Sequence, residues 1–157
     1  MLSGSIGEVH TSTTRVRYAD TDAMGIVYNA VYLVWFEVGR TEWLRARGMP
    51  YSEVETRGMS LPVVEATLRF LSGARYDELV EIGTRLREVR SRRIVFDYRI
   101  HVGDRLLVEG STSHVPVEIA TGRAARIPDW LRRALGFPAC GQAPQHTAGV
   151  ARSPNEL

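Results

Sequence analysis

The stretch from Ala30 to Arg47, AVYLVWFEVGRTEWLRAR, constrains the fold more than any other part of this 157-residue chain. It contains no proline, it is apolar almost all round over its first half, and it becomes charged only in its last turns. A helix that is apolar on every side has to be covered on every side. The sequence therefore predicts a long helix, ended by Gly48 and Pro50, whose first half is wrapped by the rest of the protein.

Gly39 lies inside this predicted helix. A glycine there costs roughly 1 kcal/mol of helix propensity relative to alanine. We expect this cost to be offset by a close approach of the helix backbone to a sheet.

Strand patterns follow the helix and predict what covers it. Apolar residues alternate with polar ones over 64–70, 80–86 and 94–102, as they do when successive side chains point to opposite faces of a sheet. Gly103 and Asp104 indicate a tight turn before a long strand over 105–119, whose apolar phase slips and predicts a β-bulge near Gly110.

Three shorter elements complete the prediction. They are a strand in TTRVRY (13–18), a short strand in RAARI (123–127) that closes the sheet, and a helix in PDWLRRAL (128–135). The order predicts an α+β fold in which an antiparallel sheet of five or six strands wraps around one long central helix. Such a sheet has an uncovered edge, and we expect a homodimer to cover it.

The length fits one domain, which we place at 13–135 between a flexible lead (1–12) and a disordered, Ala-, Gly- and Pro-rich tail (136–157). The net charge of +2 is too small to indicate a nucleic-acid partner. The single cysteine, Cys140, excludes an internal disulfide. No apolar run approaches the roughly 18 residues of a membrane span, and no secretion signal is evident. We expect a soluble cytoplasmic protein.

The loop YADTDAMGIVYN (18–29) places Asp20 and Asp22 just before the helix. Two such acids are compatible with a metal loop, a catalytic carboxylate or a turn. A calcium loop requires an oxygen ligand where Met24 stands and a glutamate where Val31 stands, so we predict no metal site.

The end of the same loop predicts an environment for a carbonyl group. Asn29 is expected to cap the helix, and a helix N-terminus offers free amide donors and a partial positive charge. Gly25 would allow a substrate to approach the backbone closely.

Several motifs resemble the 4-hydroxybenzoyl-CoA thioesterase family of hotdog-fold acyl-CoA thioesterases, and within it the YbgC-like branch. The similarity runs from about residue 14 to residue 135. It is carried by Tyr18, DTD (20–22), GIVYN (25–29), Tyr32, FE (36–37), RTEWLR (40–45) and ARYDELVEI (74–82).

The resemblance implies an acyl-CoA thioester hydrolase with the hotdog fold. It implies that Asp22 acts as nucleophile or as general base for water, that the Asn29 amide polarises the thioester carbonyl, and that Tyr18 shapes the pocket. It places the site at a dimer interface, with dimers pairing into a homotetramer. No cofactor is implied, because coenzyme A is part of the substrate. YbgC-like members usually carry histidine where Asn29 stands, and a backbone donor survives that change.

The sequence leaves the substrate open between fatty and aromatic acyl groups and between coenzyme A and acyl carrier protein. The pocket is expected to involve Met24, Gly25, Val27 and Tyr28, and the phosphates could meet Arg90, Arg92 and Arg93.

Two alternatives accompany this hypothesis. One is a non-catalytic hotdog scaffold that binds acyl thioesters or proteins, in which Asp22 only fixes the loop. The other makes Glu37 the working carboxylate; we favour for it a structural role with Arg40 or Thr41. We expect His114 to be an ordinary surface or edge histidine.

Overall fold

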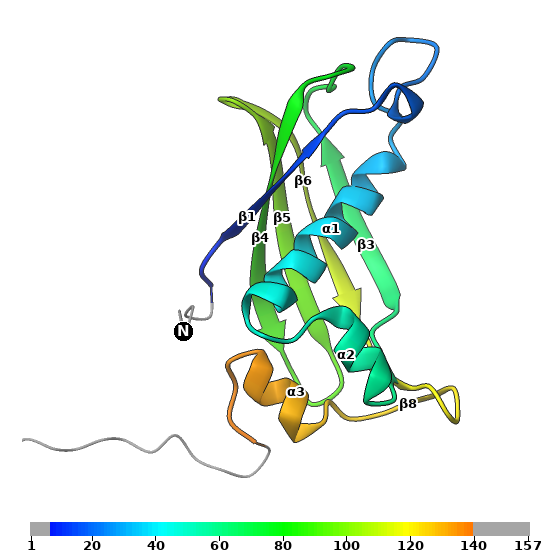
Figure 1. Ribbon diagram of the computed structural model, residues 1–157, viewed down its shortest axis with the longest axis vertical. Coiled ribbons are helices and arrows are strands. Elements are labelled where there is room, and N and C mark those ends of the chain that lie inside the picture. Colours follow the sequence, from blue (N-terminus) through cyan, green and yellow to red (C-terminus); the bar gives the residue numbers. More distant parts are fainter. Residues whose placement is uncertain (1–6, 140–157) are drawn as a thin grey trace, which may run out of the picture.

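The computed structural model describes residues 7–139, and its centre is a five-stranded antiparallel sheet with strand order β1-β4-β5-β6-β3. Figure 1 shows helix α1 lying along one face of this sheet. The elements are β1 (His10–Arg15), the 3-10 turn η1 (Tyr18–Asp20), α1 (Val31–Ala46), α2 (Tyr51–Thr56), β2 (Met59–Ser60), β3 (Val63–Phe70), β4 (Leu79–Val89), β5 (Ile94–Val102), β6 (Arg105–His114), β7 (Val117–Glu118), β8 (Arg123–Ala124) and α3 (Asp129–Ala134). The predicted α+β class and the long central helix are confirmed. The prediction that the first half of the helix is covered on every side is wrong for the single chain, because α1 buries one stripe and leaves Leu33 and Val34 exposed.

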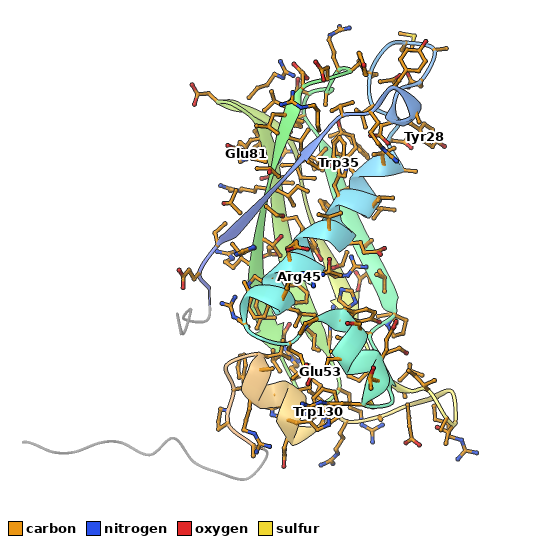
Figure 2. All side chains as sticks on the ribbon, viewed as in Figure 1. Tyr28, Trp35, Arg45, Glu53, Glu81 and Trp130 are labelled. Carbon is orange, nitrogen blue, oxygen red and sulfur yellow. The ribbon has the colours of Figure 1, made fainter. Side chains whose placement is uncertain are left out.

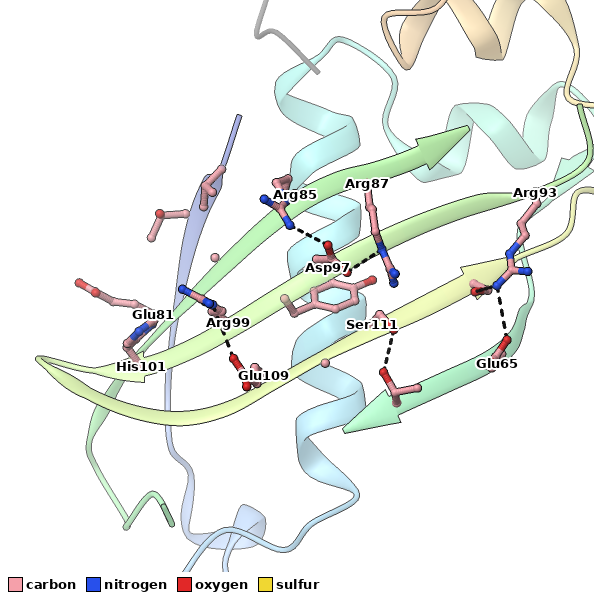
Figure 3. A pocket seen from close by; sticks show the side chains of 17 residues that line it. Glu65, Glu81, Arg85, Arg87, Arg93, Asp97, Arg99, His101, Glu109 and Ser111 are labelled. Atoms are coloured by element: carbon pink, nitrogen blue, oxygen red, sulfur yellow. Dashed lines mark hydrogen bonds and ion pairs between the residues drawn. The ribbon is translucent and has the colours of Figure 1, made fainter. Parts of the chain in front are cut away.

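The strand phases are also as predicted. In β4 and β5, every second residue is apolar and is buried on the face toward α1. The side chains of Arg85, Asp97 and Arg99 lie on the opposite face (Figure 3). The buried set is Val80, Ile82, Leu86, Ile94, Phe96, Tyr98 and Ile100. The turn at Gly103 joins β5 to β6 with Val102 paired to Arg105.

The bulge predicted near Gly110 lies earlier in the strand. Gly110 is in register with Tyr98, and the shift lies instead between the pairs Ile100–Val108 and His101–Leu106, so that Leu107 is the extra residue. The strand also ends at His114, before Pro116, which cannot donate a backbone hydrogen bond. The later apolar residues therefore belong to another element and not to a continued strand.

Two of the small elements differ from the prediction. The strand in RAARI does not close the main sheet, because β8 pairs with β7 and β7 with β2 in a separate three-stranded sheet. Helix α2, which follows Pro50 and buries Val54 completely, was not predicted.

The ends of the domain differ in detail from the predicted limits. β1 begins at His10, inside the expected lead, and pairs with β4. Phe137, in the expected tail, packs partly against the core. The remainder of both segments, residues 1–6 and 140–157 with Cys140, lies outside the described residues. No helix within residues 7–139 is long and apolar enough to cross a membrane.

The close approach of α1 to the sheet depends on two glycines. A Cβ atom on Gly39 would overlap Thr84 Oγ1 and lie 2.8 Å from Ile82 Cγ2, so the helix backbone rests directly on β4. A Cβ atom on Gly110 would overlap the Thr67 carbonyl oxygen and lie 3.0 Å from the Phe36 ring. That ring stacks on Tyr98 with centroids 4.1 Å apart. The predicted approach at Gly39 is confirmed.

Replacing Gly39 with alanine should therefore destabilise the protein, by about 1–3 kcal/mol, because the added methyl group overpacks the contact with β4. Urea unfolding measures the change. Alanine favours a helix by roughly 1 kcal/mol over glycine, so a Gly39→Ala protein that is more stable than wild type would contradict the packing argument. Ala46→Gly, at the exposed end of the same helix, measures the propensity effect alone.

Candidate functional site

The loop before α1 is a short hairpin that Asp20 anchors. Thr21 bridges Val27, and the Asp20 carbonyl accepts the Tyr28 amide at 2.9 Å. The Asp20 carboxylate is buried and accepts hydrogen bonds from the Arg17 backbone amide at 2.9 Å and from its guanidinium at 2.8 Å. The Arg17 side chain, through these hydrogen bonds, lowers the pKa of Asp20 although burial opposes the change. Asp20 is thus committed to the structure of the loop.

Asp22 occupies the turn of the hairpin and is exposed. Its Oδ1 accepts the Met24 amide at 2.8 Å, and its carbonyl accepts the Gly25 amide at 3.0 Å. Gly25 has φ of +74°, a left-handed conformation that glycine adopts without strain. Within residues 7–139 the second carboxylate oxygen of Asp22 has no hydrogen-bond partner. The turn therefore orients the carboxylate and leaves one oxygen for chemistry.

The start of α1 offers a free donor, although not through the expected cap. The N-cap residue is Ala30, no side chain caps the helix, and the first helical residue is Val31, so the predicted capping by Asn29 is wrong. The Val31 amide donates to the Tyr28 carbonyl at 2.9 Å, which makes Asn29 a turn residue. The backbone N–H of Asn29 donates to no acceptor among the described residues. Figure 1 shows the hairpin and this helix end together at one end of the molecule.

The other residues expected in the pocket differ in exposure. Tyr18 is 79% exposed and packs edge-on against Tyr76, with centroids 5.8 Å apart. Met24 and Tyr28 are exposed on the hairpin, and Val27 is buried in the core. Neither of the two cavities described below is lined by these residues or by Asp22. The hairpin thus presents an open surface that requires a second wall to enclose a substrate.

The three arginines lie far from this surface. Arg90 and Arg93 close the β4–β5 hairpin, where the Arg90 carbonyl accepts a hydrogen bond from Arg132 of α3. Figure 2 places Tyr28 and Trp130, a neighbour of Arg132 on α3, at opposite ends of the molecule. The length of β4, roughly 30 Å, separates the two ends. All three arginines are exposed, and Arg90 is ion-paired with Glu88 and Arg93 with Glu65.

The larger hollow, of about 750 Å³, lies on the sheet face that is turned away from α1 (Figure 3). Its charges already compensate one another. Asp97 pairs with Arg85 at 2.9 Å and with Arg87 at 3.0 Å, and Arg99 lies 3.7 Å from Glu109. We do not assign it to the chemistry of Asp22, because the sheet separates it from α1.

A second cavity of about 210 Å³, here called the Arg40 pocket, lies between α1 and the segment that leads into β3. It is lined by Glu37, Arg40, Thr41, Leu44, Tyr51, Leu61, Pro62, Val63, Phe96 and His114. Sequence reasoning did not find it, because its walls come from five separate stretches of the chain.

His114, expected at the surface, is buried beside this pocket. Its Nδ1 lies 2.9 Å from the Leu61 carbonyl, which only accepts, so Nδ1 carries the proton. Nε2 then accepts from the Thr112 hydroxyl at 2.8 Å, and Thr112 accepts from Tyr98 at 2.6 Å. Burial lowers the pKa of His114 to about 4, with the Leu61 carbonyl opposing and the charge of Arg40 adding to the effect. The chain of hydrogen bonds thus fits the neutral imidazole.

Neither candidate region has the arrangement of a metal site. No group of three His, Cys, Asp or Glu side chains in the described part of the chain could hold a metal ion.

Comparison with known proteins gives a consistent result. Residues 16–135 match the family model described as Thioesterase-like superfamily. A Bacillus subtilis protein, YneP, provisionally named an acyl-CoA thioesterase, is 35% identical over 120 residues, which cover 73% of this chain and 87% of that protein. The acyl-CoA thioesterase YbgC of Haemophilus influenzae is 29% identical over 122 residues, 77% of this chain and 90% of its own. The crystal structure of the hypothetical protein TT1821 from Thermus thermophilus has a TM-score of 0.77 and 45% identity, covering 80% of this chain and 96% of that one.

The buried histidine makes stability depend on pH. Its pKa is about 4 in the folded protein and about 6.5 when unfolded, so the unfolded state binds more protons between these values. Stability should be complete above pH 6.5 and decrease as the pH falls toward 4. We expect a loss of about 2 kcal/mol between pH 7 and pH 4.5, measured by urea unfolding.

The variant His114→Asn keeps a donor for the Leu61 carbonyl and cannot titrate. Its loss of stability over the same pH range should be smaller than that of wild type by about 2 kcal/mol. Equal losses in the two proteins would show that other groups are responsible.

Proposed function

Because the chain belongs to the Thioesterase-like superfamily, we propose that it hydrolyses acyl-CoA thioesters with Asp22 as its working carboxylate. The observation that supports this proposal is the division between the two acids of the loop. Asp20 is buried and fully engaged with Arg17, whereas Asp22 is exposed, held by its turn and left with one free oxygen.

In the proposed reaction, Asp22 acts on the thioester carbonyl carbon in one of two ways. As a nucleophile, it forms an acyl-enzyme anhydride and expels the thiolate, and water then cleaves the anhydride. As a general base, it takes a proton from the water molecule that attacks the carbon, and the C–S bond breaks as the thiolate leaves. Both routes need no metal, because the carboxylate is charged at pH 7 and the thiolate is a good leaving group.

Either route places negative charge on the carbonyl oxygen. The unpaired backbone N–H of Asn29, just before α1, is our candidate for stabilising that charge. One preorganised donor of this kind is worth on the order of 3 kcal/mol in the transition state. The helix dipole adds to the effect, because its positive end lies at the N-terminus of α1, next to this donor.

We further propose that a homodimer completes the site. Strand β3 is a free edge of the sheet, and its apolar side chains are unusually exposed, with Val64 58% and Phe70 52% accessible. Leu33 and Val34 of α1 add to this apolar surface. Pairing two β3 edges about a two-fold axis would cover it and remove the free edge. Further pairing into a homotetramer remains a prediction from the family resemblance.

Such a dimer also suggests a role for the arginines that lie far from Asp22 in one chain. Antiparallel pairing of the β3 edges places the start of one strand beside the end of the other. The end of the partner that carries its β4–β5 hairpin is thereby turned toward the Asp22 end of this chain. Arg92, exposed and without an ion pair among residues 7–139, is the arginine best placed to meet phosphates in this arrangement.

The acyl group remains a choice between fatty and aromatic, and the carrier between coenzyme A and acyl carrier protein. Met24 and Tyr28, exposed beside Asp22, could pack against either kind of acyl group. The alternative function, a scaffold that binds acyl thioesters without turnover, needs Asp22 only for its turn.

The substitution Asp22→Asn separates these functions. Asparagine can still accept the Met24 amide, so the turn should persist, but it provides neither a nucleophilic nor a basic oxygen. We expect thioester hydrolysis, followed as free thiol released from a panel of acyl-CoAs, to fall at least about 100-fold. Unfolding by urea should change by less than about 0.5 kcal/mol.

Asp20→Asn is the matched control at the neighbouring acid. It should destabilise the fold by about 1–3 kcal/mol, because it removes a buried charged acceptor from Arg17. Full activity of Asp22→Asn, or wild-type protein that binds the acyl-CoAs without releasing thiol, would favour the scaffold.

A further inference from the structure

The Asp22 hairpin has a cationic neighbour, Arg75, on the loop between β3 and β4. The backbones of Arg75 and Ile26 form an antiparallel bridge. A Cβ atom on Gly25 would lie 3.9 Å from Arg75 Nη1, so the guanidinium rests against the turn that Asp22 and Gly25 close. With standard covalent dimensions, these contacts place Nη1 within about 10 Å of the Asp22 carbonyl oxygen.

The backbone that carries Arg75 is held in place by Glu78. The Arg75 amide donates to Glu78 Oε2 at 2.8 Å, and Arg105 donates to both oxygens of the same carboxylate, at 2.7 and 2.9 Å. Burial opposes ionisation of Glu78, but these hydrogen bonds and the charges of the two arginines lower its pKa. Glu78 therefore stays charged and fixes the loop, and both of its oxygens are already engaged.

The guanidinium of Arg75 is left without a partner. The side chain is exposed, and it forms no hydrogen bond or ion pair within residues 7–139. Asp77, on the same loop, faces Arg15 instead, at 3.9 Å. Asp22 also keeps one free oxygen. A free anionic oxygen and a free cation thus lie close to one turn without pairing with each other.

Enclosure of this surface would make the free cation costly. In the proposed dimer, the second subunit supplies a wall beside Asp22, and less water would reach Arg75. An unpaired charge away from water is unfavourable. A neutral acyl group would leave this cost in place, whereas an acyl group that carries an anion would offset it. Arg75 would also balance the repulsion between that anion and Asp22.

We infer that Arg75 determines specificity and selects thioesters whose acyl group ends in a carboxylate. Arginine binds a carboxylate through two parallel N–H···O bonds. The short separation from Asp22 suits the acyl side of the thioester, because the phosphates of coenzyme A lie beyond the pantetheine arm on the other side. The exposed side chains of Met24 and Tyr76 can contact the apolar part of the chain. The inference rests on the proposed thioesterase function and adds to it a class of acyl group.

The experiment compares adipyl-CoA with hexanoyl-CoA, which has the same carbon chain without the terminal carboxylate. Thiol release gives kcat/KM for each substrate. Calorimetry gives the dissociation constants for Asp22→Asn protein, in which turnover is expected to be slow. Wild type should favour adipyl-CoA by at least about tenfold in kcat/KM, and Asp22→Asn should bind it at least about tenfold more tightly.

Variants assign this selectivity to one charge. Arg75→Gln, made in wild type and in Asp22→Asn, should reduce both ratios at least about tenfold. Arg75→Lys keeps the charge without the two parallel donors and should retain part of the selectivity. Arg85→Gln is the matched control, because Arg85 is exposed on the sheet face away from α1 and Asp97 keeps Arg87 as a partner at 3.0 Å. It should show the wild-type ratios.

The outcomes separate this inference from the proposed function. Hydrolysis of both substrates with equal kcat/KM would overturn the inference and leave the function standing. Equal weakening of both substrates by Arg75→Gln would show that Arg75 meets the phosphates that they share, and it would also overturn the inference. If neither substrate releases thiol, the proposed function fails, and the dissociation constants still test Arg75. Equal or absent binding of the two would then contradict its role.

Discussion

The close contact between α1 and the sheet underlies the rest of the structure. The helix backbone lies against Thr84 and Ile82 because Gly39 has no side chain there, and the Phe36 ring reaches Tyr98 because Gly110 has none beneath it. The position of the helix over β4 and β5 fixes where its N-terminal end emerges, next to the Asp22 hairpin. It also leaves β3 largely uncovered, which creates both the apolar edge and the space that becomes the Arg40 pocket.

The hairpin before α1 shows how two nearby aspartates acquire different roles. Asp20 is buried, and its charge is compensated by Arg17 and a backbone amide, so it serves as an internal anchor. Asp22, two residues later, lies at the exposed turn and retains an unengaged oxygen. Environment and not residue type separates the anchor from the candidate catalyst.

The polar interior of the protein follows the same logic. The hydrogen bonds from Tyr98 through Thr112 to His114 and the Leu61 carbonyl satisfy each group in its neutral form. Arg40 lies at the end of this network, where it is hydrogen-bonded to the Tyr98 hydroxyl and paired with Glu37 at 3.9 Å.

Much of this fold could be predicted from the sequence, because it rests on local periodicity. The apolar residues 30–36 predicted the helix itself but not its one-sided burial, since Leu33 and Val34 are exposed, and the alternation in β4 and β5 predicted the face that packs against α1. The small α2 was missed because six residues carry too little periodicity to be read. The bulge was misplaced because Leu107, the extra residue, is apolar like its neighbours and does not mark its own position.

The candidate site divides in the same way. The loop motif identified Asp22 and the helix start, since both lie within one continuous stretch. Only the tertiary structure showed that Asp20 is internal, that Ala30 and not Asn29 precedes the helix, and that Arg90 and Arg93 stand at the far end of β4. Likewise, the burial of His114 and the Arg40 pocket arise from segments distant in sequence. Short-range patterns are set by the chain's own geometry, whereas burial, ion pairing and cavities depend on which distant segments are brought into contact.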